Sequence, residues 1–275
     1  EMCIRDRLTR DQQPAASSTE KSQIRNPKSE IVLIVEDNPD MRTYIRQHLE
    51  DDYQIKEAEN GEEGIKQAEE IMPDLIITDV MMPRMDGYTF SKKIRHSEKT
   101  SHIPIIMLTA KAGEDSKIEG LETGVDDYLT KPFSARELQV RIKNLIELRK
   151  TLRKQFSTAT IITPSEISAT PMDQAFLQRI VEIVETHIGD EQFSPEVLGQ
   201  EAGMTVRHLN RKLKALIDQP AAQFIRSLRL QRAADLLKQQ AGNITEICFQ
   251  VGFSNLETFT RNFKKQFGVS PSEYK

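Results

Sequence analysis

The chain has 275 residues, 37% hydrophobic and 29% charged, a composition typical of globular proteins with room for two domains. No apolar run approaches the roughly 20 residues that a membrane helix needs, so we expect no membrane contact. Cys3 and Cys248 lie far apart and lack metal-type spacing. We therefore expect a reducing compartment, the cytoplasm.

The net charge of −4 conceals a strong asymmetry along the chain. Residues 29–133 carry 23 acidic and 12 basic side chains, whereas residues 203–275 carry 5 acidic and 12 basic ones. An acidic half joined to a basic half favours contact between the C-terminal part and a polyanion. Two merely solvated surfaces would give the same charges, so charge alone leaves both interpretations open.

The first 28 residues are expected to lie outside any folded domain. Residues 2–7, Met-Cys-Ile-Arg-Asp-Arg, resemble a translated adapter sequence from library preparation, so residues 1–7 are not expected to belong to the fold. The chain would then be the C-terminal piece of a longer protein. Residues 8–28 are rich in Gln, Ser, Thr and charge, which is typical of a disordered linker.

Apolar runs alternate with helix-like stretches from residue 29 onward. The runs cover residues 31–35, 75–79, 105–108 and 128–130. Pro39 opens a first helical pattern, and further helix-like stretches cover residues 62–71, 88–96 and 116–123. This alternation predicts an α/β doubly wound (flavodoxin-like) domain, with a parallel sheet covered by helices on both faces.

Charged and hydroxyl side chains end these apolar runs: Glu36, Asp37, Asp79, Thr109 and Lys131. The carboxyl ends of parallel strands form one edge of such a sheet, so these groups should converge. Converging carboxylates repel one another unless a cation neutralises them, and Mg²⁺ suits carboxylates and phosphate oxygens. The lysine and the threonine hydroxyl can bind a phosphoryl group. The alternative, isolated turn or cap residues, would not explain five such groups.

This segment resembles the CheY-like receiver domains of two-component signalling. The residues that carry the resemblance are Glu36-Asp37, Asp79, Met82-Pro83, Met85-Asp86-Gly87, Thr109-Ala110 and Lys131-Pro132-Phe133. The resemblance implies a receiver domain over residues 29–150 in which Asp79 accepts a phosphoryl group from a phosphohistidine.

Further roles follow from the same resemblance. It implies that Glu36, Asp37, Asp79 and the backbone carbonyl of Met81 hold Mg²⁺. Phosphate would be bound by Thr109, Ala110 and Lys131, with Thr109 and Tyr128 as the switch pair and a cis Lys131–Pro132 bond. A hydrolase of the haloacid dehalogenase type is a rival interpretation. It is disfavoured because such enzymes place a second Asp two residues after the nucleophile, where this chain has Met81.

A connector follows the receiver-like segment. Ser134 is expected to cap a helix that ends that domain and continues outward, carrying the basic residues Arg149, Lys150, Arg153 and Lys154. A basic run of this kind is usually a solvated face, and DNA contact is the alternative. Residues 151–171 are assigned to a linker because Ser, Thr and Pro are frequent over residues 157–171.

Residues 172–275 have an all-α pattern in which a helix-turn-helix arrangement occurs twice. In the first unit Ser194 and Thr205 cap helices around a turn containing Gly203, and Pro220 then opens a long connecting helix. The second unit has a helix from Asn243 and another capped at Ser254-Asn255.

The two units resemble the DNA-binding domain of the AraC family of transcription activators. The residues that carry it are Ile244-Thr245-Glu246-Ile247, Val251-Gly252-Phe253-Ser254, the stretch 259–265 and Phe267-Gly268-Val269-Ser270-Pro271. The resemblance implies recognition helices in successive major grooves of double-stranded DNA. The matching base-facing positions are Arg207, Asn210 and Arg211, and then Leu256, Glu257 and Arg261. Leu256 departs from a polar reader. Phosphate-contact candidates are Lys212, Lys214, Arg226, Lys264 and Lys265.

The sequence therefore predicts a phosphorylation-dependent transcription regulator of a two-component system, which as this chain is not an enzyme. Its partners would be a histidine kinase or phosphohistidine domain, which can lie on the same polypeptide, and DNA, with homodimerisation left open. Two alternatives stay open. The intact protein could be a histidine kinase of hybrid type whose catalytic parts lie outside this chain, or the DNA-binding domain could be uncoupled from phosphorylation.

Overall fold

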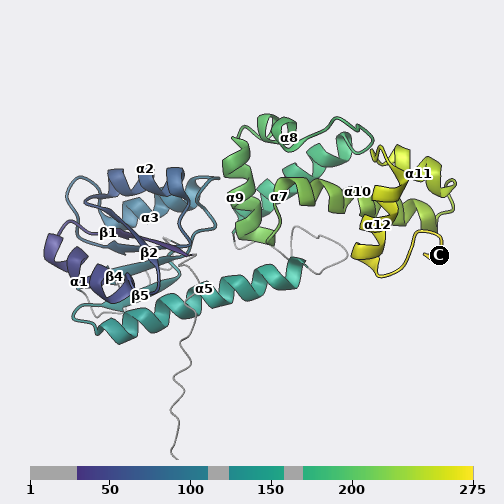
Figure 1. Ribbon diagram of the computed structural model, residues 1–275. Helices are drawn as coiled ribbons and strands as arrows, with labels where there is room; N and C mark the ends of the chain where they lie inside the picture. Colours follow the sequence, from purple (N-terminus) through teal and green to yellow (C-terminus); the bar gives the residue numbers. More distant parts are fainter. Residues whose placement is uncertain (1–29, 111–123, 158–169, 275) are drawn as a thin grey trace, which may run out of the picture.

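The structure, a computed structural model, describes residues 30–110, 124–157 and 170–274. It consists of an α/β part followed by an all-helical part (Figure 1). The segments expected at residues 1–28 and the helix expected at 116–123 lie outside the described residues. Among the helices that are described, none has the length and apolar character needed to cross a membrane.

The α/β part is built on a five-stranded parallel sheet in the order β2-β1-β3-β4-β5. The strands are β1 (Ile31–Val35), β2 (Gln54–Ala58), β3 (Leu75–Asp79), β4 (Ile105–Thr109) and β5 (Asp127–Thr130). Asp79 lies opposite Leu108 across the β3–β4 ladder, and Thr109 lies opposite Thr130. The carboxyl ends of β3, β4 and β5 therefore meet at one edge, and the doubly wound prediction is confirmed.

Strand β2 was not predicted from the sequence. Its residues are Gln-Ile-Lys-Glu-Ala. The first four alternate between exposed and partly buried positions, because β2 lies at the edge of the sheet, and the last, Ala58, is fully buried. The four predicted strands were recognised as continuous apolar runs, which buried parallel strands produce. An edge strand of five residues with charged side chains lacks that signal.

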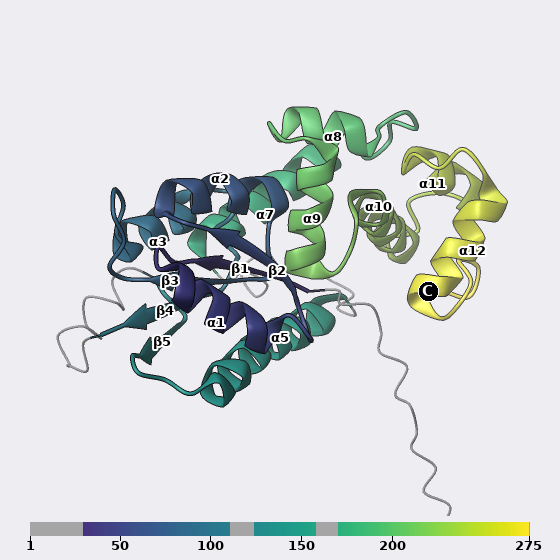
Figure 2. The same ribbon diagram turned by 60° about the vertical axis from the view of Figure 1, so that its left-hand side comes forward.

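Helices cover both faces of the sheet (Figures 1 and 2). Helices α1 (Pro39–Leu49) and α5 (Ala135–Ser157) pack on one face, and α2 (Gly61–Ile71) and α3 (Gly87–His96) pack on the other. Successive residues of a strand point to opposite faces, so Ile34 belongs to the first core and Leu33 to the second. Both faces are buried, which explains why the inner strands are apolar throughout.

Helix α5 begins where the sequence predicts and continues beyond the sheet. The Ser134 hydroxyl accepts a hydrogen bond from the backbone N–H of Glu137 at 3.1 Å. Further along, Arg149 pairs with Asp126 at 2.9 Å and Lys150 with Glu30 at 2.5 Å. These two members of the basic run therefore bind carboxylates of the α/β part.

The helical part contains two small cores joined by one long helix. Its elements are α7 (Pro171–Thr186), α8 (Pro195–Glu201), α9 (Val206–Ile217), α10 (Ala221–Lys238), α11 (Ile244–Gln250) and α12 (Leu256–Phe267). Helices α7, α8 and α9 share one core with the start of α10, and α11 and α12 share the other with its end. Gly203 and Gly252 have φ angles of 68° and 77° in the turns of the two units. Glycine adopts this left-handed conformation without steric cost.

The predicted helix caps are mostly observed. Thr205 accepts from His208 N, and Asn255 accepts from Thr258 N. Asn243 forms a capping box with Glu246, in which each side chain accepts from the other residue's backbone N–H. Ser194 occupies the N-cap position of α8, but its side chain makes no capping hydrogen bond.

Candidate functional site

An acidic cluster occupies the carboxyl edge of the sheet. Glu36 and Asp37 follow β1, and Asp79 is the last residue of β3. One carboxylate oxygen from each lies within 4.8 Å of the others. Glu36 and Asp79 are only 1% and 7% exposed, whereas Asp37 is open to solvent. The neighbouring ends of β1 and β3 therefore bring together the three side chains that the sequence predicted to converge.

Lys131, which follows β5, is the cationic partner of this cluster. Its ammonium nitrogen lies 2.9 Å from Asp79 Oδ1 and 3.0 Å from Glu36 Oε2. Burial, reinforced by the charge of Asp79, raises the pKa of Glu36 although Lys131 opposes the shift. Burial acts to lower the pKa of Lys131, but hydrogen bonds to Asp79 and Glu36 raise it overall. The lysine is therefore held as a cation beside the Asp79 carboxylate.

The other predicted residues border this cluster. Thr109 is 5% exposed at the end of β4, and its carbonyl accepts from the backbone N–H of Lys131 at 2.7 Å. Tyr128 is half-buried on β5, Ala110 is exposed, and Met81 is 75% exposed after β3. The bond between Lys131 and Pro132 is cis, as the resemblance implied.

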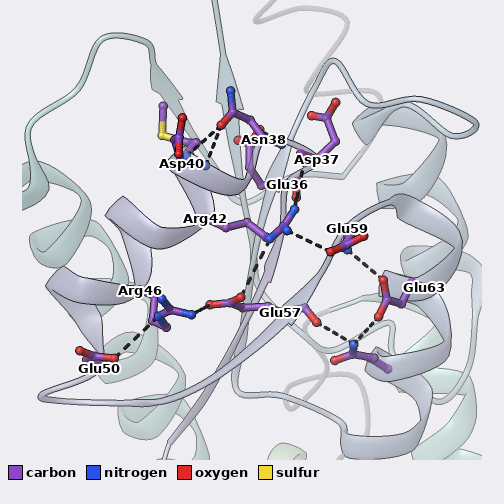
Figure 3. A network of polar contacts seen from close by, with 12 residues as sticks. Glu36, Asp37, Asn38, Asp40, Arg42, Arg46, Glu50, Glu57, Glu59 and Glu63 are labelled. Carbon is purple, nitrogen blue, oxygen red and sulfur yellow. Dashed lines mark hydrogen bonds and ion pairs between the residues drawn. The ribbon is translucent and has the colours of Figure 1, made fainter.

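Arg42 holds the backbone of the acidic loop in place through hydrogen bonds, a role that was not predicted from the sequence. Its guanidinium donates to the backbone carbonyls of Glu36 at 2.7 Å and Asp37 at 3.1 Å, and it pairs with Glu59 at 3.1 Å (Figure 3). Only 11% of its side chain is exposed. Arg42 lies on α1 one turn after the Asn38 cap, so an arginine following an acidic pair at this spacing could have indicated it.

Gly87 permits the close approach of α3 to the strand that carries Asp79. A Cβ added at Gly87 would lie 2.1 Å from the Asp79 carbonyl oxygen, far inside van der Waals contact. The Gly87 N–H donates instead to the carbonyl of Val80 at 2.9 Å. The glycine thus sets the path of the loop that contains Met81.

The base-facing candidates of the first helix-turn-helix unit lie in contrasting environments. Arg207 is exposed near the start of α9. Asn210 accepts a hydrogen bond from the backbone N–H of Ala221 at 2.8 Å, at the beginning of α10. Arg211 donates to the backbone carbonyls of Ile71 at 2.5 Å and Glu70 at 3.2 Å, at the end of α2. The structure therefore places Arg211 against the α/β part.

All three candidates of the second unit are exposed. Leu256 and Glu257 begin α12, and Arg261 lies one turn further along the same helix. Phe259 and Phe263 occupy the opposite face and are fully buried. This separation leaves one face of α12 open to solvent.

Lys212 departs from the expectation of a phosphate contact. It is 0% exposed, and its ammonium lies 3.1 Å from the buried carboxylate of Asp173 on α7. The same ammonium lies 4.4 Å from the centre of the Phe176 ring. The remaining phosphate-contact candidates are exposed: Lys214, Arg226, Lys264 and Lys265.

Comparison with known protein families identifies both parts of the chain. Residues 32–143 match the response regulator receiver domain, and residues 198–275 match a helix-turn-helix domain. The chain joins a response regulator receiver domain to an AraC-type helix-turn-helix domain. This is the domain composition of a two-component DNA-binding regulator.

Relatives of this chain occur among both histidine kinases and transcriptional regulatory proteins. A histidine kinase of Formosa agariphila is 43% identical over 243 residues, which are 88% of this chain and 18% of that protein. The transcriptional regulatory protein ResD of Bacillus subtilis is 46% identical over 116 residues, 42% of this chain and 47% of ResD. The receiver domain of a sensor histidine kinase from Pseudomonas aeruginosa has 35% identity and a TM-score of 0.41, covering 43% of this chain and 98% of that one. The chain thus spans less than a fifth of the first relative's length.

Proposed function

We propose that this chain is a DNA-binding regulator controlled by phosphorylation of Asp79, with a phosphohistidine as the donor. The receiver domain would occupy residues 29–150, a linker 151–171 and the DNA-binding domain 172–275. The observation that carries the proposal is the Asp79 carboxylate, which lies 2.9 Å from Lys131 within a cluster of acidic side chains.

The chemistry follows from the positions of these groups. An Asp79 carboxylate oxygen attacks the phosphorus, the P–N bond of the phosphohistidine breaks, and the imidazole leaves with the electron pair. Lys131 offsets negative charge on the transferred group, and Thr109 at the adjacent strand end offers a hydroxyl donor. Positioning and charge neutralisation of this kind provide most of the catalysis in phosphoryl transfer.

The acidic cluster also fits a divalent cation. Glu36, Asp37 and Asp79 provide the carboxylate oxygens that Mg²⁺ prefers, and the Met81 carbonyl lies in the adjoining loop. Bound Mg²⁺ would offset the repulsion between these carboxylates and an incoming phosphoryl group. Arg42 would hold the Glu36–Asp37 backbone in the geometry that such binding requires.

Thr109 and Tyr128 are proposed to transmit the change. A new phosphoryl group adds strong acceptor oxygens beside Thr109. Movement of that hydroxyl toward phosphate would open space for the half-buried Tyr128 ring on the neighbouring strand. Addition of the phosphoryl group would thereby shift the equilibrium between two conformations of the receiver domain.

DNA recognition is assigned to helices α9 and α12. Arginine binds guanine in bidentate fashion, Asn can pair with adenine and Glu can accept from cytosine. The proposed readers are Arg207, Asn210 and Arg211 on α9, and Leu256, Glu257 and Arg261 on α12. Leu256 offers only apolar contact, such as a thymine methyl group.

Phosphorylation with acetyl phosphate and Mg²⁺ tests the receiver assignment. We expect Asp79→Asn to abolish phosphoryl uptake, because the amide is not a nucleophile, and EDTA to abolish it in the wild-type chain. Asp86→Asn is the matched control, since Asp86 caps α3 and Asn caps equally well. Uptake by Asp79→Asn at wild-type stoichiometry would refute the proposal.

The phosphohistidine donor is proposed to reside on the same polypeptide in the parent protein. The support is the relative from Formosa agariphila, a histidine kinase that is similar to this chain through both of its domains. The reading frame upstream of residue 1 tests this directly. A kinase core encoded there in frame would support a hybrid sensor, and a start codon without one would support a free-standing regulator.

A further inference from the structure

Helix α9, the proposed recognition helix of the first unit, lies against the receiver domain. Figures 1 and 2 show it between the receiver and α10, and it also packs beside α5. Its receiver contacts are at the end of α2 and at the turn between α3 and β4. This edge is opposite the phosphorylation site, because β4 runs from it toward Thr109.

Arg211 binds backbone acceptors of the receiver. The last carbonyls of a helix have no partner within the helix and carry the negative end of its dipole. In α2 two of these, Glu70 O and Ile71 O, accept from Arg211 Nη1 at 3.2 and 2.5 Å. Met72 ends α2 in a left-handed conformation and turns the chain away. The guanidinium thus binds a pair of closely spaced oxygen acceptors, as it would on guanine or phosphate.

Lys212 makes the second contact of this kind. Its ammonium donates to the backbone carbonyl of Glu98 and pairs with Asp173. Ser101 of the receiver donates from its hydroxyl to Asp173 Oδ1 at 2.7 Å. Lys212, Asp173 and Ser101 are all 0% exposed. Burial acts to raise the pKa of Asp173, but the charge of Lys212 and its other polar neighbours lower it overall. A buried ion pair is therefore completed by receiver groups.

The receiver turn is held rigidly for this contact. Arg95 donates from one nitrogen to the carbonyls of Ser101 at 2.7 Å and Ile103 at 2.8 Å, and it also pairs with Asp126. An exposed ion pair joins the domains nearby, between Arg179 of α7 and Glu98 at 2.9 Å. The contact thus combines a preorganised acceptor surface with complementary charge.

We propose that this acceptor edge, defined by Glu70, Ile71, Glu98 and Ser101, is an internal binding surface for α9 that competes with DNA. The inference rests on the proposed function, since it requires α9 to be a DNA-reading helix. The receiver binds the side chain of Arg211 and buries that of Lys212. The first unit would therefore bind DNA only after the two domains separate. An acidic domain binding a basic recognition helix reproduces the charge complementarity of DNA.

The test uses the full chain carrying Ser101→Asp. Aspartate is larger than serine and would place a second carboxylate beside Asp173 in a fully buried site. The single Lys212 ammonium, which contacts both positions, can neutralise only one of the two carboxylates, so the domains should separate. Ser97→Asp is the matched control, because the same substitution falls on the same turn, at a partly exposed residue whose backbone hydrogen bonds stay within α3 and that turn. Equal phosphoryl uptake by both variants verifies that the receiver is folded.

Two measurements decide the outcome. Small-angle X-ray scattering should show a larger radius of gyration for Ser101→Asp than for Ser97→Asp. Fluorescence anisotropy with a random-sequence DNA duplex pool of about 40 base pairs should show about tenfold tighter binding, the change expected if about 10% of molecules are undocked beforehand. The added negative charge by itself would weaken binding to DNA. Tighter binding would therefore have to come from separation of the domains.

A charge exchange provides an independent check. Glu98→Lys and Arg179→Glu should each tighten DNA binding by a few fold, because each replaces an attraction between domains with a repulsion. The double variant Glu98→Lys/Arg179→Glu restores the pair at unchanged net charge and should return affinity to the wild-type value.

The possible failures are distinguishable. Unchanged scattering, or separated domains with unchanged DNA affinity, would overturn the inference and leave the proposed function standing. Absence of DNA binding by the wild-type chain and by every variant, with and without phosphorylation, would overturn both.

Discussion

The two helix-turn-helix units share an element order but differ in what covers their recognition helices. In the first unit, α9 contacts the receiver through Arg211 and Lys212. In the second, α12 lies at the end of the molecule distant from the receiver and exposes Glu257 and Arg261 (Figures 1 and 2). Helices at equivalent positions in the two units therefore differ in how accessible they are to a ligand.

The cores of the units differ as well. The first is dominated by aliphatic residues of α7, α8 and α9, whereas in the second, aromatic rings of α12 pack against Tyr274 in edge-on or tilted geometry. Because α10 contributes its first half to one core and its second half to the other, each unit has its own packing. The comparison suggests that the units can respond separately to substitution.

The largest expected effect is a loss of stability confined to the second unit. Phe263 is fully buried, with ring centres of Phe259 at 5.6 Å and Phe267 at 4.5 Å. Phe263→Ala should lower the free energy of unfolding of this unit by about 3–5 kcal/mol, through lost transfer energy and a cavity. Urea denaturation followed by circular dichroism would measure it. Phe249→Ala, at a residue that is 53% exposed, is the control and should change little.

If the two cores are independent, Phe263→Ala should leave the first unit unchanged. Hydrogen exchange in α9 should stay at the wild-type rate, because α9 has the other core and the receiver contact. Faster exchange in α9 would show that the two units unfold together.

A smaller effect is expected on DNA affinity. Arg261→Ala should weaken binding of the unphosphorylated chain by about 1–3 kcal/mol if Arg261 reads a base. Arg211→Ala should change it by less than about threefold, because loss of a DNA contact is offset by a weaker receiver contact. In the Ser101→Asp background both substitutions should weaken binding similarly. Anisotropy titrations with one selected DNA site would compare these four variants with the wild-type and Ser101→Asp chains. A large loss for Arg211→Ala in the wild-type background would mean that α9 is already available.

The smallest expected difference concerns helix capping. Asn243→Ala should destabilise the second unit by about 1 kcal/mol, because the capping box with Glu246 is lost. Ser194→Ala should lower the free energy of unfolding by only a few tenths of this amount, since the Ser194 side chain makes no capping hydrogen bond. Thermal unfolding would compare them, and Asn243→Asp should retain wild-type stability. Equal losses at the two positions would show that the caps are equivalent in solution.

Much of the fold could be predicted because the local patterns were strong. The apolar runs at β1, β3 and β4 indicated buried parallel strands, and all three are fully or almost fully buried. Strand β2 was missed because an edge strand does not need a continuous apolar sequence. The convergence of Glu36, Asp79 and Lys131 was predictable because parallel strands end at a common edge. Arg42 was missed because the acceptors through which it holds the acidic loop are backbone carbonyls, which any sequence provides.

The sequence by itself determined the two kinds of domain, the chemistry at the strand ends and the position of most helix caps. These depend on residue type and on contacts within a few residues or along one strand. Tertiary structure alone decided that Lys212 is buried against Asp173 and that Arg211 binds the end of α2. The Arg211 contact joins residues 140 positions apart through a backbone acceptor, and the Lys212–Asp173 pair joins two helices of one domain at a position that Ser101 of the receiver covers. The physical reason is that access to a charged side chain depends on which surfaces exclude water around it.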